Sequence, residues 1–139
     1  MGSTASEWIT ACIDGGARGN PGPAGYGVHV CDQSGKVLAE ISKFLGHQTN
    51  NYAEYSALLA ALDYAIANGY RKLKIFSDSE LLVKQLRGEY KVRSPELREL
   101  YEEARARIRK LEKFQIEHVR RELNRAADRL ANDAMDMGK

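Results

Sequence analysis

The order of strand-like and helix-like patterns constrains the fold of this chain more than any other feature of its sequence. Three strand-like segments come first, at residues 8–13, 26–31 and 36–44. In the first of them, apolar and polar residues alternate from Ile9 to Ile13, as in a strand with one buried face. A polar turn over residues 32–35 joins the other two as a hairpin. The sequence therefore opens with an antiparallel meander of three strands.

Helix-like and strand-like segments alternate after the meander. They are, in order, a helix over 51–68, a short strand from 73 that ends at Asp78, a brief helix over 80–86, a helix over 95–111, a strand over 114–119 and a final helix from 124 to about 137. Apolar residues recur at helical spacing in these helices, and Ser94-Pro95 is a typical helix start. This order predicts an α/β fold with one mixed five-stranded sheet, in which two parallel strands follow the meander and helices flank the faces.

Size and composition indicate one compact domain and argue against a membrane role. The 139 residues fit a single domain over 1–139, of which 1–6 are expected to be disordered. No apolar run approaches the roughly 20 residues that span a bilayer. The two cysteines, Cys12 and Cys31, have neither metal-site spacing nor the number of a disulfide framework, which predicts reduced thiols and a cytoplasmic protein. No obligatory protein partner is predicted, and a monomer is expected.

The net charge of +2 is too small to indicate a nucleic-acid partner by itself. Basic residues gather locally instead, in a middle cluster and a late cluster: Lys84, Arg87, Lys91 and Arg93, then Arg120, Arg121, Arg125 and Arg129. A solvated surface explains each cluster as well as a track for phosphates does. Charge alone therefore leaves both interpretations open.

Four carboxylates occupy places where the pattern calls for buried residues. Asp14 and Asp78 each end an apolar strand, at the rim of a buried layer. Glu54 lies one helical turn before Leu58 and so continues the row that faces the sheet. Asp128 belongs to the apolar stripe of the last helix and is predicted to point inward. A single such residue is usually a helix cap or an ion-pair partner, but four in different elements favour a shared pocket.

A shared pocket of carboxylates needs a cation. Burying several like charges together costs many kcal/mol unless something positive neutralises them. Oxygen ligands alone suit Mg²⁺, with Mn²⁺ as its natural substitute, and no histidine or cysteine set competes. Two such ions can activate a water molecule and hold the leaving oxygen of an in-line phosphodiester displacement. The sequence thus predicts a divalent-metal site.

Each carboxylate lies in a short motif. The motifs are DGGARGNPG at 14–22, TNNYAE at 49–54, SDS at 77–79 and RELNRAAD at 121–128. In this order, across nearly the whole chain, they resemble type 1 ribonuclease H. The resemblance implies the ribonuclease H-like fold and endonucleolytic hydrolysis of the RNA strand of RNA–DNA hybrids, which leaves 5′-phosphate and 3′-hydroxyl ends. It also implies two Mg²⁺ ions per active site, held by the catalytic residues Asp14, Glu54, Asp78 and Asp128.

The resemblance further implies contacts with the hybrid. The glycine-rich turn after Asp14 brings main chain close to the nucleic acid, and asparagines near Glu54 read the minor groove, where the 2′-hydroxyl distinguishes RNA from DNA. Thr49 is implied to hold a DNA-strand phosphate, although capping of a helix explains this threonine equally well. The substrate-binding residues implied are Gly15, Gly16, Asn20, Thr49, Asn50, Asn51, Arg121 and Asn124, the last of which also orients Asp128.

The chain also departs from the well-known bacterial members of that family. It passes directly from Gly88 to one amphipathic helix and so lacks their basic protrusion, which predicts a weaker grip on substrate. The short segment 119–123 lacks their mobile histidine, and Arg121 and Glu122 are the candidates to replace it. His118 lies within a predicted strand and is assigned a structural or solvent-facing place.

Two other functions stay open at this stage. A hybrid-binding module without catalysis would share the fold, although the intact carboxylate set argues against it. A DNA-cutting nuclease of the resolvase or integrase kind would also share it, since a fold alone does not define a function. The asparagines beside Glu54 favour RNA as the strand that is cut.

Overall fold

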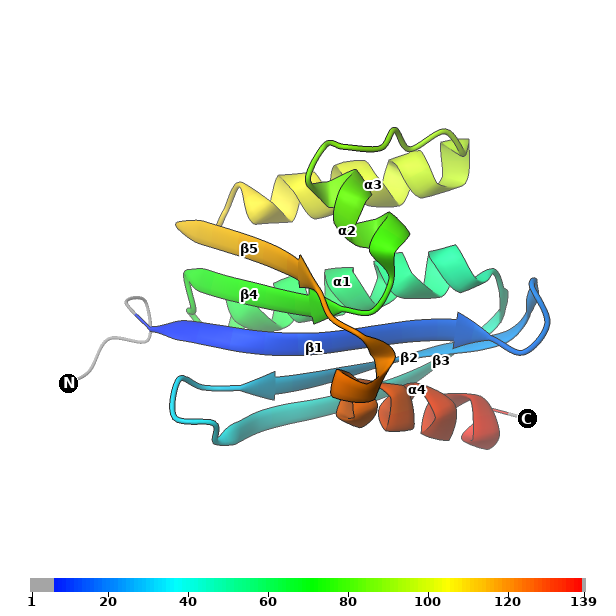
Figure 1. Ribbon diagram of the computed structural model, residues 1–139, viewed down its shortest axis with the longest axis horizontal. Helices are drawn as coiled ribbons and strands as arrows, with labels where there is room; N and C mark the ends of the chain where they lie inside the picture. The colour runs from blue at the N-terminus through cyan, green and yellow to red at the C-terminus, as the bar shows by residue number, and fades with distance from the viewer. Residues whose placement is uncertain (1–6, 139) are drawn as a thin grey trace.

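Five strands form one mixed sheet in the structure, a computed structural model that describes residues 7–138. They lie in the order β3-β2-β1-β4-β5, with the bounds β1 Trp8–Ala17, β2 Gly22–Cys31, β3 Val37–Gln48, β4 Lys72–Ser77 and β5 Lys113–His118. β1, β2 and β3 pair antiparallel, whereas β4 pairs parallel with both β1 and β5 (Figure 1). This confirms the predicted fold class. The expectation of disorder at 1–6 lies outside the described residues.

Four helices flank the sheet within the described part of the chain: α1 Asn50–Ala67, α2 Glu80–Leu86, α3 Pro95–Ile108 and α4 Arg125–Met137, the last preceded by a 3₁₀ turn at Arg121–Leu123. Each helix starts within one residue of its predicted position. The first three starts are fixed by side-chain caps. Thr49 Oγ1 accepts a hydrogen bond from Tyr52 N at 3.1 Å, and Ser79 and Ser94 cap α2 and α3 in the same way. No helix between residues 7 and 138 is long and apolar enough to cross a membrane.

The helices cover both faces of the sheet. In Figure 1, α1 lies behind the sheet and α4 in front of it, and α3 packs against α1. The main core fills the space between α1 and the sheet, where Ile13, Leu58 and Leu62 are fully buried. α4 rests directly on β2, since a Cβ at Gly27 would lie 2.4 Å from the main-chain oxygen of Ala127. Two layers of helices therefore sandwich the strand that carries Asp14.

The prediction of a turn directly after Asp14 was wrong. β1 continues to Ala17, and Gly15 and Gly16 pair with Tyr26 and Gly25 of β2. Gly15 is needed for packing instead, because a Cβ there would lie 2.3 Å from the main chain of α1. The turn comes later, at residues 18–21, and so β2 begins four residues before its predicted start.

Candidate active site

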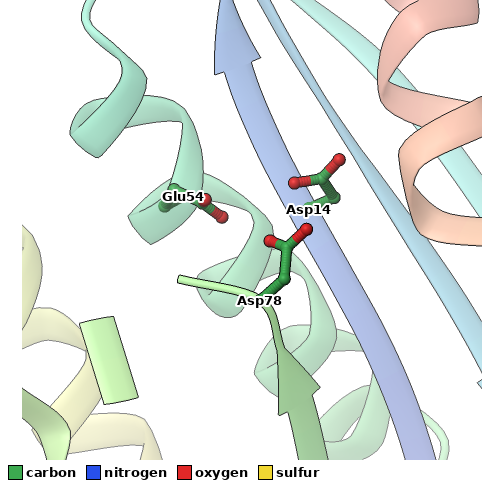
Figure 2. A group of neighbouring side chains, drawn as sticks. All are labelled: Asp14, Glu54 and Asp78. Carbon is green, nitrogen blue, oxygen red and sulfur yellow. The ribbon is translucent and has the colours of Figure 1, made fainter. Parts of the chain in front are cut away.

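Three carboxylates meet at one edge of the central strands. Asp14 lies on β1, Asp78 directly follows β4, and Glu54 lies near the start of α1. Because β1 and β4 are parallel neighbours, with Ile13 paired to Ser77, the two aspartates reach the same end of the sheet. Figure 2 shows the three side chains converging from strand, loop and helix, and one oxygen of each lies within 4.8 Å of the others. The structure therefore brings together three of the four predicted catalytic residues in one compact group.

The fourth carboxylate, Asp128, forms another wall of the same site. A cavity of about 670 Å³ is lined by all four carboxylates, and Asp128 reaches it from α4. Its side chain is 36% exposed and lies 4.0 Å from Arg121 Nη2. The inward-pointing place predicted for Asp128 is thus an open one: its carboxylate faces this cavity and not the apolar core.

Burial and mutual repulsion raise the pKa of the Asp14 and Glu54 carboxyl groups. Burial, the charges of Asp78 and Asp128, and a hydrogen bond with Asp128 raise the pKa of Asp14 to about 8, against a weaker opposing effect of Arg121. Burial and the charges of Asp14 and Asp78 likewise raise the pKa of Glu54 well above its usual range. Glu54 Oε1 also accepts a hydrogen bond from Gly15 N at 3.1 Å. A bound cation would oppose both shifts, because it favours the ionised carboxylates.

Three arginines and a histidine share the cavity wall with the carboxylates. The cavity lining includes Arg18, His118, Arg120 and Arg121. The Arg18 guanidinium is held at the rim by α4, where it donates to Asp136 Oδ1 at 2.5 Å. Sequence reasoning left His118 outside the site, yet its strand pairs it with Ser77, next to Asp78. The parallel pairing of β4 and β5 was the signal that would have found it.

The residues predicted to bind substrate do not all lie on the cavity wall. Gly15, Gly16, Asn50 and Arg121 line the cavity. Asn50 Oδ1 accepts from Ala17 N at 2.7 Å, and Asn50 N donates to Asn20 Oδ1 at 3.0 Å, so the two asparagines tie α1 to the turn after β1. Thr49 caps α1, which supports the capping alternative given for it. Asn51 is exposed and lines a separate groove beside Tyr90 and Arg93.

Asn124 has a buried place in the structure. Its side chain is 1% exposed and does not line the cavity. Nδ2 donates to the main-chain oxygen of Ile13 at 2.8 Å, directly before Asp14, while its own main-chain oxygen accepts from Asp128 N. Asn124 therefore joins the segment that carries Asp14 to the helix that carries Asp128. Its Oδ1 has no hydrogen-bond partner among the described residues.

Comparison with known proteins assigns the family. The model of a family described as reverse transcriptase-like matches residues 12–134, a span that contains all four carboxylates. Ribonuclease HI of Halobacterium salinarum is 41% identical over 128 residues, which cover 92% of this chain and 64% of that protein. The chain belongs to the ribonuclease H-like family. The resemblance inferred from the four motifs is thereby confirmed.

Other members of the ribonuclease H-like family are equally close. A bifunctional protein of Mycobacterium tuberculosis is 49% identical over 125 residues, which cover 88% of this chain and 34% of that protein. The solved ribonuclease H domain at its N-terminus superposes with a TM-score of 0.92 at 45% identity, covering 95% of this chain and 96% of the other. A ribonuclease H1 from compost, solved with an RNA/DNA hybrid, gives a TM-score of 0.89 at 40% identity, with 94% and 98% covered. The chain thus spans about a third of the mycobacterial relative and under two thirds of the archaeal one.

Proposed function

We propose that this chain is an endoribonuclease that hydrolyses the RNA strand of RNA–DNA hybrids with the help of two divalent metal ions. The observation that carries the proposal is the group of Asp14, Glu54 and Asp78, which places three oxygens within 4.8 Å of one another inside a cavity rimmed by arginines. The likeness to a ribonuclease H1 solved with an RNA/DNA hybrid supports hybrid as the substrate.

The donor set fits Mg²⁺ or Mn²⁺. All the ligand atoms offered are carboxylate oxygens, which these hard ions prefer. The raised pKa of Asp14 supports this proposal, because a carboxyl group that ionises with difficulty on its own is stabilised as an anion by a bound cation. Asp14, Glu54, Asp78 and Asp128 would hold the ions, which when bound lower the pKa of a coordinated water molecule and neutralise charge on the scissile phosphate.

The chain's own residues position these groups and receive the nucleic acid. The Gly15 N–H fixes one oxygen of Glu54, and the absence of a side chain at Gly16 leaves main chain accessible on the cavity wall. Arg18, Arg120 and Arg121 add positive charge that attracts phosphates toward the carboxylates. Arg121 is the best placed of these to take over the part of the mobile histidine, since it lies 4.0 Å from Asp128.

RNA is distinguished from DNA, in this proposal, at the start of α1. Asn50 lines the cavity and is locked by hydrogen bonds to Ala17 and Asn20. Amide side chains and main-chain groups held in this way can hydrogen-bond a 2′-hydroxyl in a wide minor groove. The chain is further proposed to act as a monomer in the cytoplasm, which agrees with two cysteines that are both free in the described part of the chain.

A cleavage assay with three substrates tests the proposal. Labelled RNA–DNA hybrid, duplex RNA and duplex DNA are incubated with the protein in Mg²⁺, in Mn²⁺ and in a chelator. We expect cuts in the RNA of the hybrid only when metal is present, and loss of turnover but not of hybrid binding in Asp14→Asn. The matched control Asp133→Asn, an exposed aspartate on α4, should cleave normally. Binding without any cleavage would establish the inactive module instead, and preferred cutting of duplex DNA would establish the resolvase-like alternative.

A further inference from the structure

A second group of metal-ligating side chains lies on the face of the sheet that carries Asp14. Cys12 of β1 pairs directly across from His29 of β2, and Cys31 follows His29 by two positions on the same strand. Because side chains alternate between the faces of a sheet, all three project from one face. Two ligands at i and i+2 on one strand, with a third opposite the first, can enclose a single ion from one side. No sequence spacing reveals this group, since the two cysteines are 19 residues apart.

The contacts of His29 are those of a metal-ligating imidazole. Its Nδ1 lies 3.7 Å from Cys31 Sγ. A tetrahedral Zn²⁺ with Zn–S of about 2.3 Å and Zn–N of about 2.0–2.1 Å holds sulfur and nitrogen about 3.6 Å apart. The other ring nitrogen, Nε2, lies 3.5 Å from Glu40 Oε2 on β3, and Arg129 of α4 holds that same oxygen at 3.0 Å. A carboxylate on the far nitrogen of a histidine is the usual outer partner at zinc sites.

The two thiols are not placed to form a disulfide with each other. Both are free in the described structure. They form a diagonal pair on neighbouring strands, for which the Cβ atoms lie roughly 7 Å apart, whereas a disulfide needs about 3.5–4.5 Å. A metal ion placed between them bridges a larger gap than a sulfur–sulfur bond does. The two cysteines are therefore too far apart for a disulfide and are suited to binding one metal ion together.

We propose that Cys12, His29 and Cys31 bind one thiophilic divalent ion of the zinc class, with the Glu40 carboxylate beside the second ring nitrogen of the histidine. Among residues 7–138 only the carboxylate group has three ligand atoms within 4.8 Å of one another. Metal binding at the new site therefore requires the Cys12 side chain to turn about its Cα–Cβ bond toward His29 and Cys31. Each thiol releases its proton to solvent as the metal binds. Three protein ligands leave the fourth position to water or to a small thiol. The ion cross-links β1 to β2 two residues before Asp14.

Cobalt titration in saturating Mg²⁺ tests this site independently of nuclease activity. Only sulfur ligands give the intense thiolate-to-cobalt charge-transfer absorption in the near ultraviolet. Cobalt bound at the carboxylates therefore does not contribute to this absorption. We expect the absorption to saturate at one Co²⁺ per chain and to disappear when Zn²⁺ is added. Cys31→Ser and Cys12→Ser should each abolish it, and Glu40→Gln should weaken Co²⁺ binding by about tenfold.

The controls separate a built site from adventitious binding. His47→Gln, which removes an exposed histidine from β3, should leave the titration unchanged, whereas His29→Gln should weaken binding by about tenfold or more. Circular dichroism checks that each variant is folded, and Cys31→Ala provides a second, apolar replacement. Absence of the charge-transfer band in the wild-type protein overturns the proposal. It is equally overturned if the band survives in Cys12→Ser, or if it arises only from dimers at high protein concentration.

Discussion

Replacing Asp14 with asparagine is expected to stabilise the protein when divalent metal is absent. In the unfolded chain Asp14 ionises near its usual pKa of 3.8, whereas burial and the neighbouring carboxylates raise its pKa in the folded protein to about 8. A difference of this size corresponds to on the order of 5 kcal/mol of destabilisation once the group is ionised in both states. The cavity is open and its other carboxyl groups can take up the proton instead, so we expect about 2–3 kcal/mol of this to be recovered by the substitution.

The pH dependence fixes the sign of the effect. Between about pH 4 and pH 8 the folded state binds the Asp14 proton more strongly than the unfolded state does, so the wild-type protein loses stability as the pH rises through this window. Asparagine cannot ionise and removes that loss. The advantage of Asp14→Asn is therefore small near pH 4, grows with pH and levels off above about pH 8.

Urea unfolding in a chelator at pH 5 and pH 8 measures this advantage, with Asp133→Asn as the exposed control. Added Mg²⁺ should stabilise the wild-type protein more than Asp14→Asn, because a ligand stabilises the state that binds it. If Asp14→Asn is less stable than the wild type at pH 8 without metal, or if its advantage is the same at both pH values, the electrostatic account of the cavity is refuted.

Three further substitutions test how the site is positioned. Gly15→Ala should destabilise the protein by about 1–3 kcal/mol in urea unfolding, since its Cβ meets the main chain of α1, whereas Gly16→Ala, whose nearest contacts are 3.8 Å away, should cost far less. Asn124→Ala should cost about 1–3 kcal/mol and weaken Mg²⁺ binding in calorimetry, because it breaks the buried bond between α4 and β1; unchanged metal affinity would contradict its positioning role. Arg121→Ala should weaken hybrid binding and reduce the slope of its salt dependence by about one, while Arg109→Ala, which changes an exposed residue directly after α3, should do neither.

The carboxylates could be placed from the sequence because periodicity constrains them. Asp14 and Asp78 follow the apolar stretches of two strands that turn out to be parallel neighbours, and Glu54 continues the buried row of its helix. Such positions follow from alternation along a strand and from spacing along a helix, which are local properties. The same reasoning gave Asp128 the correct helix face but not its exposure, since exposure depends on how far α4 covers the sheet.

The remaining errors concern contacts between distant segments. Gly15 was assigned to a turn, because glycine is common in turns and nothing local indicates that α1 approaches the strand there. Asn124 was assigned to the substrate because motif position cannot tell a buried amide from an exposed one. His118 was left out because its nearness to Asp78 arises from the pairing of β5 with β4, across 40 residues of chain. Each required the tertiary structure.

The alternation along β1 makes the cavity intolerant of changes in chain length. Ile13 and Asp14 point to opposite faces, one into the core beside α1 and the other into the cavity. One residue inserted or deleted within the strand would exchange them, seating an aliphatic group among the ion-binding oxygens and a carboxylate in the apolar interior. Natural length variation among relatives should therefore collect in the hairpin at 32–36 and spare residues 8–17.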